Sequence, residues 1–83
     1  MLEYKYDTQL LIEGNNLSED EINEYITKNI EGDCILAVGD EDLIKIHFHT
    51  NTPWKVIEYG ASLGDVFDIV IENMERQENG LQG

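Results

Sequence analysis

Apolar and polar residues alternate in three stretches of this chain, and a fourth stretch is a short apolar run. The alternating stretches are residues 5–13, 43–50 and about 66–72, and the apolar run is residues 34–38. They predict four strands, because successive side chains of a strand point to opposite faces of the sheet. Residues 18–31 and 53–63 repeat apolar side chains three or four positions apart, which predicts two amphipathic helices.

Capping residues mark the ends of both predicted helices. Ser18 is the expected N-cap of the first helix, and Glu21, three residues later, completes a capping box. Pro53 suits the first turn of the second helix, because the N–H that proline lacks has no partner there. Gly32 and Gly64 are expected to terminate the two helices.

The order strand, helix, strand, strand, helix, strand predicts an α+β fold. It is the ferredoxin-like split βαββαβ plan, a four-stranded antiparallel sheet with two helices on one face. The turn at residues 39–42 makes the second and third strands a hairpin. Right-handed crossovers then place the third strand beside the first, in the centre of the sheet. Residues 5–73 form this single domain, and the polar, unpatterned residues 74–83 are predicted to be a flexible tail.

One face of each strand is predicted to form the core. The inward sets are Tyr6, Thr8, Leu10 and Ile12; Leu36 and Val38; Ile44, Ile46 and Phe48; and Phe67, Ile69 and Ile71. Cys34 shares the side of Leu36 and Val38, so we expect it to be a buried structural thiol. Trp54 and Tyr59 are expected to pack against the core rather than to stack on a ligand.

The composition fits one small folded domain with an acidic surface. The chain has 83 residues, 41% of them hydrophobic, and a net charge of −13. Nucleic acids and anionic membranes need a basic surface, so neither is expected as a partner. No apolar run reaches the roughly 20 residues of a membrane span, no signal peptide is recognisable, and the single cysteine cannot form an internal disulfide. These features favour a cytoplasmic setting. The chain also has no glycine-rich phosphate loop, so it is not a complete kinase by itself.

Three potential metal ligands are predicted to meet on the open face of the sheet. His47 and His49 lie two positions apart on the third strand, so their imidazoles point the same way. Asp7 should lie beside them, because the start of the first strand neighbours the end of the antiparallel third strand. Two imidazoles and a carboxylate can ligate a borderline ion, which makes zinc the candidate cofactor. The alternative is a pair of solvated histidines beside an ordinary surface acid.

The same open face carries an apolar group made of Leu11, Leu43 and Val70. An apolar patch on a sheet suits contact with another protein surface. It would serve either a homodimer formed sheet to sheet or docking on a sister domain of the same polypeptide.

Several segments resemble one bacterial protein family. Residues 36–53, LAVGDEDLIKIHFHTNTP, are similar to its VVGDEDLVKVHVHTNDP segment. Residues 6–14 are similar to its YCTEFLIEG opening, and residues 71–77 to its I-x-N-M-x-x-Q ending. The family is the large subunit of bacterial fatty acid kinase, whose kinase domain is dihydroxyacetone-kinase-like. The resemblance covers residues 6–77 and corresponds to the middle domain.

The resemblance implies a division of labour in a larger protein. ATP and Mg²⁺ would bind in a separate kinase domain, and sister domains would lie on either side of this one. The phosphoryl acceptor would be a fatty acid presented by a DegV-type lipid-binding partner. In the family, the cysteine of YCTE and the two histidines of HxHT form a metal-binding cluster. His47 and His49 match those histidines, whereas Asp7 stands at the cysteine position and offers a harder oxygen ligand.

Three functions are compatible with these observations. The favoured one is a non-catalytic middle domain of a fatty-acid-kinase-like protein, serving domain assembly or dimerisation and metal binding. The second is a stand-alone ferredoxin-like module that binds a small ligand or dimerises. The third is a metal-dependent enzyme at Asp7, His47 and His49, which requires a substrate pocket beside these residues.

Overall fold

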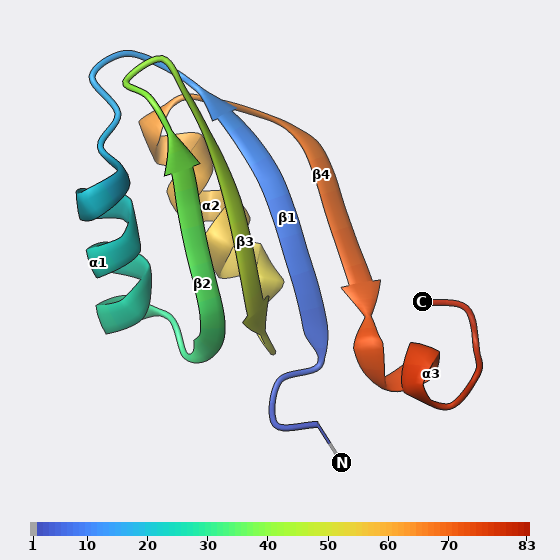
Figure 1. Cartoon of the computed structure of the whole chain (residues 1–83). Coiled ribbons are helices and arrows are strands. Elements are labelled where there is room, and N and C mark those ends of the chain that lie inside the picture. Colours follow the sequence, from blue (N-terminus) through green and yellow to red (C-terminus); the bar gives the residue numbers. More distant parts are fainter. Residues whose placement is uncertain (1) are drawn as a thin grey trace.

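The computed structural model describes residues 2–83 and contains one four-stranded sheet with helices packed against it (Figure 1). The elements are β1 (Tyr6–Glu13), α1 (Glu19–Asn29), β2 (Gly32–Gly39), β3 (Leu43–Thr50), α2 (Pro53–Leu63), β4 (Asp65–Asn73) and α3 (Met74–Glu78). The strands lie in the order β2-β3-β1-β4, and all neighbours are antiparallel. The predicted α+β class is confirmed, with β1 and β3 at the centre of the sheet. Within the described residues, no helix is long and apolar enough to cross a membrane.

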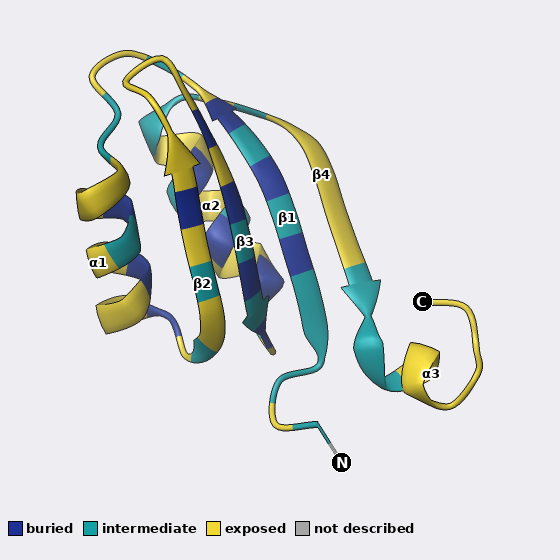
Figure 2. Ribbon diagram, viewed as in Figure 1, coloured by how far each residue is buried: buried dark blue, intermediate teal, exposed yellow. Residues whose placement is uncertain are grey.

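The core lies between the sheet and helices α1 and α2, and Figure 2 shows its buried residues recurring along β1 and β3. Its members are Leu10 and Ile12 of β1, Ile44, Ile46 and Phe48 of β3, Ala37 of β2, Ile22 and Ile26 of α1 with Ile30 after it, and Val56 of α2. The inward sets of the two central strands are thus confirmed from Thr8 and Ile44 onwards. Gly60 lets α2 lie close to the sheet, since a Cβ there would sit 3.4 Å from the side chains of Leu10 and Ile12.

Both helix starts were predicted correctly. The Ser18 hydroxyl accepts a hydrogen bond from the backbone N–H of Glu21 at 3.2 Å, and Pro53 occupies the first turn of α2. Gly64 is the C-cap of α2, as expected. The prediction for Gly32 was wrong, because α1 ends at Asn29 and Gly32 begins β2. A side chain at Gly32 would collide with the backbone and ring of residues on β3, so close strand packing accounts for this glycine.

The predicted core face of β2 was wrong. Leu36 and Val38 are exposed, and the strand faces the helices through Ala37, with Ile35 partly buried. Cys34 is also exposed rather than buried. Alternation along a strand defines two faces, but it does not say which face the helices cover. The larger apolar residues of β2 lie on the open face of the sheet, while the small Ala37 lies beneath α1.

The inward set of β4 was also wrong. Phe67, Ile69 and Ile71 are 37%, 43% and 39% exposed, and Val66 is the residue that packs against the core. The alternation breaks at a register shift opposite residues 9–11, next to Asp68 with a φ of +50°. Because β4 is an edge strand, most of it extends past the helices, as the exposed stretch in Figure 2 shows.

The two aromatic residues expected to pack have different surroundings. Tyr59 stacks on Tyr25 of α1, with ring centroids 3.8 Å apart, which joins the two helices. Trp54 is 61% exposed, so the packing role predicted for it was wrong.

A short helix occupies the first half of the predicted tail. Asn73 caps α3 by accepting a hydrogen bond from the backbone N–H of Arg76 at 3.0 Å. The backbone N–H of Met74 donates to the carbonyl oxygen of Lys5 at 2.8 Å. The segment after β4 is therefore hydrogen-bonded to the segment before β1.

The edge of β2 is closed by a side chain of α1. The Asn23 carboxamide donates to the Ala37 carbonyl at 3.2 Å and accepts from the Ala37 N–H at 3.1 Å. These are the two hydrogen bonds that a further strand would make to Ala37. Asn23 therefore fixes α1 against the edge of the sheet.

We expect Asn23→Ala to lower the free energy of unfolding by about 1–2 kcal/mol, because both backbone groups of Ala37 lose a partner. Chemical denaturation followed by circular dichroism measures this change. Asn29→Ala is the matched control, since the Asn29 side chain bonds only a helix carbonyl, that of Tyr25. Equal losses in the two variants would show that the contact with β2 contributes nothing.

Candidate metal site

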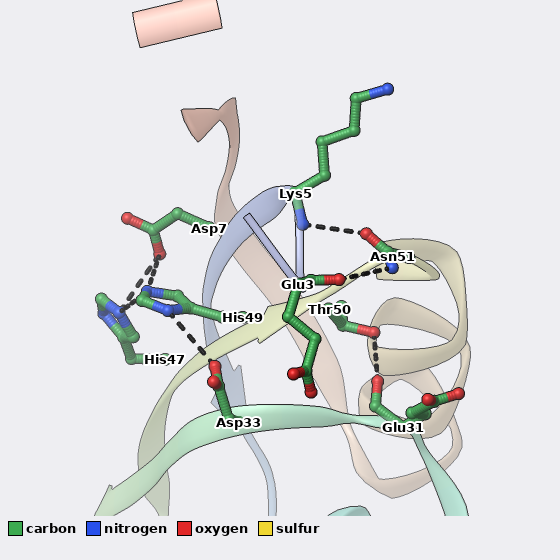
Figure 3. A network of polar contacts seen from close by, with 9 residues as sticks. All are labelled: Glu3, Lys5, Asp7, Glu31, Asp33, His47, His49, Thr50 and Asn51. Carbon is green, nitrogen blue, oxygen red and sulfur yellow. Dashed lines mark hydrogen bonds and ion pairs between the residues drawn. The ribbon is translucent and has the colours of Figure 1, made fainter. Parts of the chain in front are cut away.

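The register of the central strands places the predicted ligands side by side on the open face. Asp7 of β1 pairs directly with His49 of β3, and His47 pairs with Gln9. Directly opposed residues of an antiparallel pair project from the same face. The sequence prediction that these three side chains converge agrees with this arrangement, which Figure 3 shows.

Three donor atoms from Asp7, His47 and His49 point toward one another. Asp7 Oδ1 lies 3.2 Å from His47 Nε2 and 3.9 Å from His49 Nε2. The two Nε2 atoms are 3.2 Å apart. The side chain of Asp7 is 18% exposed, and its Oδ1 is buried without a hydrogen-bond partner. An unpartnered carboxylate oxygen beside two ring nitrogens is an arrangement that a cation would satisfy.

The spacing of these atoms fits a tetrahedral zinc ion. Zinc binds imidazole nitrogen and carboxylate oxygen at about 2.0–2.1 Å, so two ligand atoms at the tetrahedral angle are about 3.3 Å apart. Two of the three separations match this value, and the third exceeds it by a fraction of an ångström. Gln9 supports the carboxylate by donating from Nε2 to Asp7 Oδ2 at 3.4 Å. The residues present therefore suit a zinc ion with one further coordination position.

A second group of potential ligands lies on the other side of His49. Asp33 of β2 pairs with His49, and its Oδ1 lies 3.6 Å from His49 Nδ1. The Cys34 sulfur completes this group, whose ligand atoms all lie within 4.8 Å of one another. Asp33 and Cys34 were not predicted as ligands, because the hydrophobic pattern placed Cys34 in the core. Counting the register back from the hairpin turn brings Cys34 opposite His49 before any bulge is considered, and this count could have found them.

The surroundings of Cys34 disfavour its thiolate. Desolvation, then the negative charge of Asp33 and a hydrogen bond with it, raise the pKa of the Cys34 thiol above 9.0. The thiol therefore holds its proton at neutral pH although it is exposed.

The depressions on the surface lie away from the histidines. One, of about 430 Å³, lies between α1 and α2 and is lined by Tyr25, Lys55 and Tyr59. Another, of about 490 Å³, lies around Trp54 and Asn51. Among residues 2–83, neither depression is lined by His47 or His49. The substrate pocket that an enzyme at these histidines requires is thus not supplied by either.

Comparisons with known proteins agree with the arrangement of the chain. The sequence profile of the FakA-like family, described as a middle domain of fatty acid kinase, matches residues 3–81. Uncharacterized proteins of Staphylococcus aureus strains USA300 and NCTC 8325 are each 33% identical over 78 residues. The alignment covers 89% of this chain but only 14% of each relative. The chain thus spans about one seventh of the length of these relatives.

We expect iodoacetamide to alkylate Cys34 more slowly in the folded chain than in the urea-unfolded chain at neutral pH, because a raised pKa leaves less thiolate to react. Asp33→Asn should accelerate the folded-state reaction by removing the neighbouring charge, whereas Asp40→Asn, in the hairpin turn, should not. Mass spectrometry of timed samples gives the rates. Identical folded and unfolded rates would contradict the influence of Asp33.

Proposed function

This chain belongs to the FakA-like family of fatty acid kinase middle domains, and on that premise we propose that it is a non-catalytic domain of a larger fatty-acid-kinase-like protein. In this proposal it serves the assembly of that protein and holds a structural metal ion through Asp7, His47 and His49. The convergence of one carboxylate oxygen and two ring nitrogens from the central strands carries the metal part of the proposal.

The phosphoryl-transfer chemistry is proposed to lie in other parts of the larger protein. This chain has no glycine-rich phosphate loop, and it matches only 14% of its longer relatives. ATP and Mg²⁺ would bind in a kinase domain of the same polypeptide. The acceptor would be a fatty acid, the substrate class that the family description names, and a DegV-type partner would hold it.

The role proposed for the metal ion is to fix the two central strands to each other. Asp7 lies at the start of β1, and His47 and His49 lie near the end of β3. An ion bound by all three would join the strands where their hydrogen-bonded ladder ends and fraying begins. Zinc suits two imidazoles and one carboxylate, and the carboxylate makes the site harder than a thiolate-containing one.

The role proposed in assembly rests on the apolar part of the open face. Its exposed members are Leu36 and Val38 of β2, Leu43 of β3, and Phe67 and Val70 of β4, with Leu11 of β1 partly buried among them. Alternate residues of four adjacent strands thus form one apolar surface, which we call the open-face patch. Contiguous apolar surface of this kind usually marks a contact with another protein surface.

The charge of the chain favours a sister domain as the occupant of the open-face patch. Two copies, each with a net charge of −13, repel one another on approach. A sister domain is held nearby by the polypeptide itself, which raises its effective concentration. It can also offer an acid to Lys45, whose exposed side chain projects from the same face. We therefore propose that the open-face patch docks on another domain of the same polypeptide.

We expect zinc to raise the thermal midpoint of the chain, because an ion that binds only the folded state stabilises it by about 2.7 kcal/mol at a concentration of 100 Kd. Asp7→Asn, His47→Gln and His49→Gln should each lower the affinity roughly tenfold or more, since even the partners of metal ligands have effects of that size. Isothermal titration calorimetry measures the affinity. Glu13→Gln, an exposed carboxylate at the far end of β1, is the matched control and should bind zinc normally. Wild-type affinity in all three ligand variants would reject the site.

In the full-length protein, we expect the double variant Leu36→Ser, Val70→Ser to release this domain from its neighbour, because both side chains lie in the proposed contact. Limited proteolysis should then cut the connecting segments faster than in the wild type. Leu81→Ser is the control, since Leu81 is 52% exposed but lies beyond α3, off the sheet. A concentration-dependent dimer of the isolated chain, abolished by the double variant, would instead identify a second copy as the occupant.

A further inference from the structure

His49 presents a second potential ligand atom on the side away from Asp7. Its Nε2 faces Asp7 and His47, while its Nδ1 lies 3.6 Å from Asp33 Oδ1 (Figure 3). The ligand atoms of Asp33, Cys34 and His49 all lie within 4.8 Å of one another. Asp33 and Cys34 are exposed and the His49 side chain is 25% exposed, so an ion can reach the group from solvent.

A bulge in β2 explains why a cysteine lies there. Asp33 pairs with His49 and Leu36 pairs with His47, so Cys34 and Ile35 together stand opposite the single residue Phe48. Ile35 packs against the core, whereas Cys34 has a φ of +56° and is exposed. Bulges commonly redirect one side chain of a strand in this way. Here two consecutive residues, Asp33 and Cys34, are both brought to His49.

We propose that Asp33, Cys34 and the Nδ1 atom of His49 form a second metal site, which takes a thiophilic ion such as Zn²⁺ or Cd²⁺ and competes with the Asp7 site for His49. Cysteine thiolate, imidazole and carboxylate are the common protein ligands of zinc. The thiolate and the carboxylate of this site together neutralise a divalent ion, whereas the Asp7 site offers one negative charge. The second site shares His49 with the function proposed above but does not require the Asp7 site to be occupied.

Competition follows from the chemistry of imidazole. A neutral ring has one nitrogen with a free lone pair, and the other nitrogen carries the proton. An ion at Nδ1 leaves an N–H at Nε2 that faces the Asp7 carboxylate, and an ion at Nε2 leaves an N–H at Nδ1 that faces Asp33. In each state the carboxylate of the vacant site orients the ring, as partners of metal-bound histidines do. When the ion binds at Cys34, the S–H bond breaks, the sulfur keeps the electron pair, and the proton leaves to solvent.

Cadmium titration of the purified chain, kept reduced with a phosphine, tests the proposal. Because the chain has one cysteine, near-ultraviolet charge-transfer absorbance from thiolate to cadmium reports Cys34 alone. We expect a saturable signal in the wild type, its loss in Cys34→Ser, and a roughly tenfold or greater loss of affinity in His49→Gln. His47→Gln, which disables only the Asp7 site, should retain the signal. This variant separates failure of the second site from failure of the function proposed above.

Three outcomes would overturn the inference. No charge-transfer signal in either the wild type or His47→Gln would show that Cys34 does not bind the ion. An unchanged affinity in His49→Gln, or a signal that requires two chains per ion, would mean that the thiol acts without this histidine. Two zinc ions per chain at saturation, counted by native mass spectrometry, would contradict competition for His49.

Discussion

The antiparallel pairing of β1 with β3 is the constraint on which the rest of the structure depends. The pairing runs from Tyr6 opposite Thr50 to Glu13 opposite Leu43 without a register shift. On one face it brings together the residues that make up half of the core, and on the other face it sets Asp7 against His49. Because the side-chain period of a strand is two, a slip of one residue would turn the wrong faces toward each other. Core formation and ligand convergence therefore select the same register.

The regularity of this central pair explains what could be predicted from the sequence. Both strands are flanked by paired neighbours and have one face covered by helices, so strict alternation of residues such as Ile44, Ile46 and Phe48 identifies their inward sides. The strand order followed from the handedness of the connections, and it brought Asp7 near His47 and His49 across more than thirty-five residues of sequence. Capping chemistry was equally informative at Ser18, where a side chain bonds locally.

The edge strands were predicted less well, for a physical reason. Each edge strand has one neighbour, so it tolerates bulges, and both β2 and β4 contain one. A bulge depends on contacts with the partner strand, which a sequence pattern does not contain. The apolar residues of these strands also serve the open-face patch, so hydrophobicity alone could not distinguish the two faces. For the same reason the place of Cys34 beside His49 was missed.

Asn51 gives the histidine end of the sheet a mechanical role. Its side chain accepts from the Lys5 N–H at 2.8 Å and donates to the Glu3 carbonyl at 3.1 Å, two residues after His49 (Figure 3). The segment that leads into β1 and the segment that follows β4 meet at this end, where the Met74 N–H bonds Lys5 (Figure 1). In a longer polypeptide, both connections to the rest of the molecule would emerge from one corner. The domain would then pivot like a lobe on a double stalk, and stiffening the residues around His49 would limit its swing.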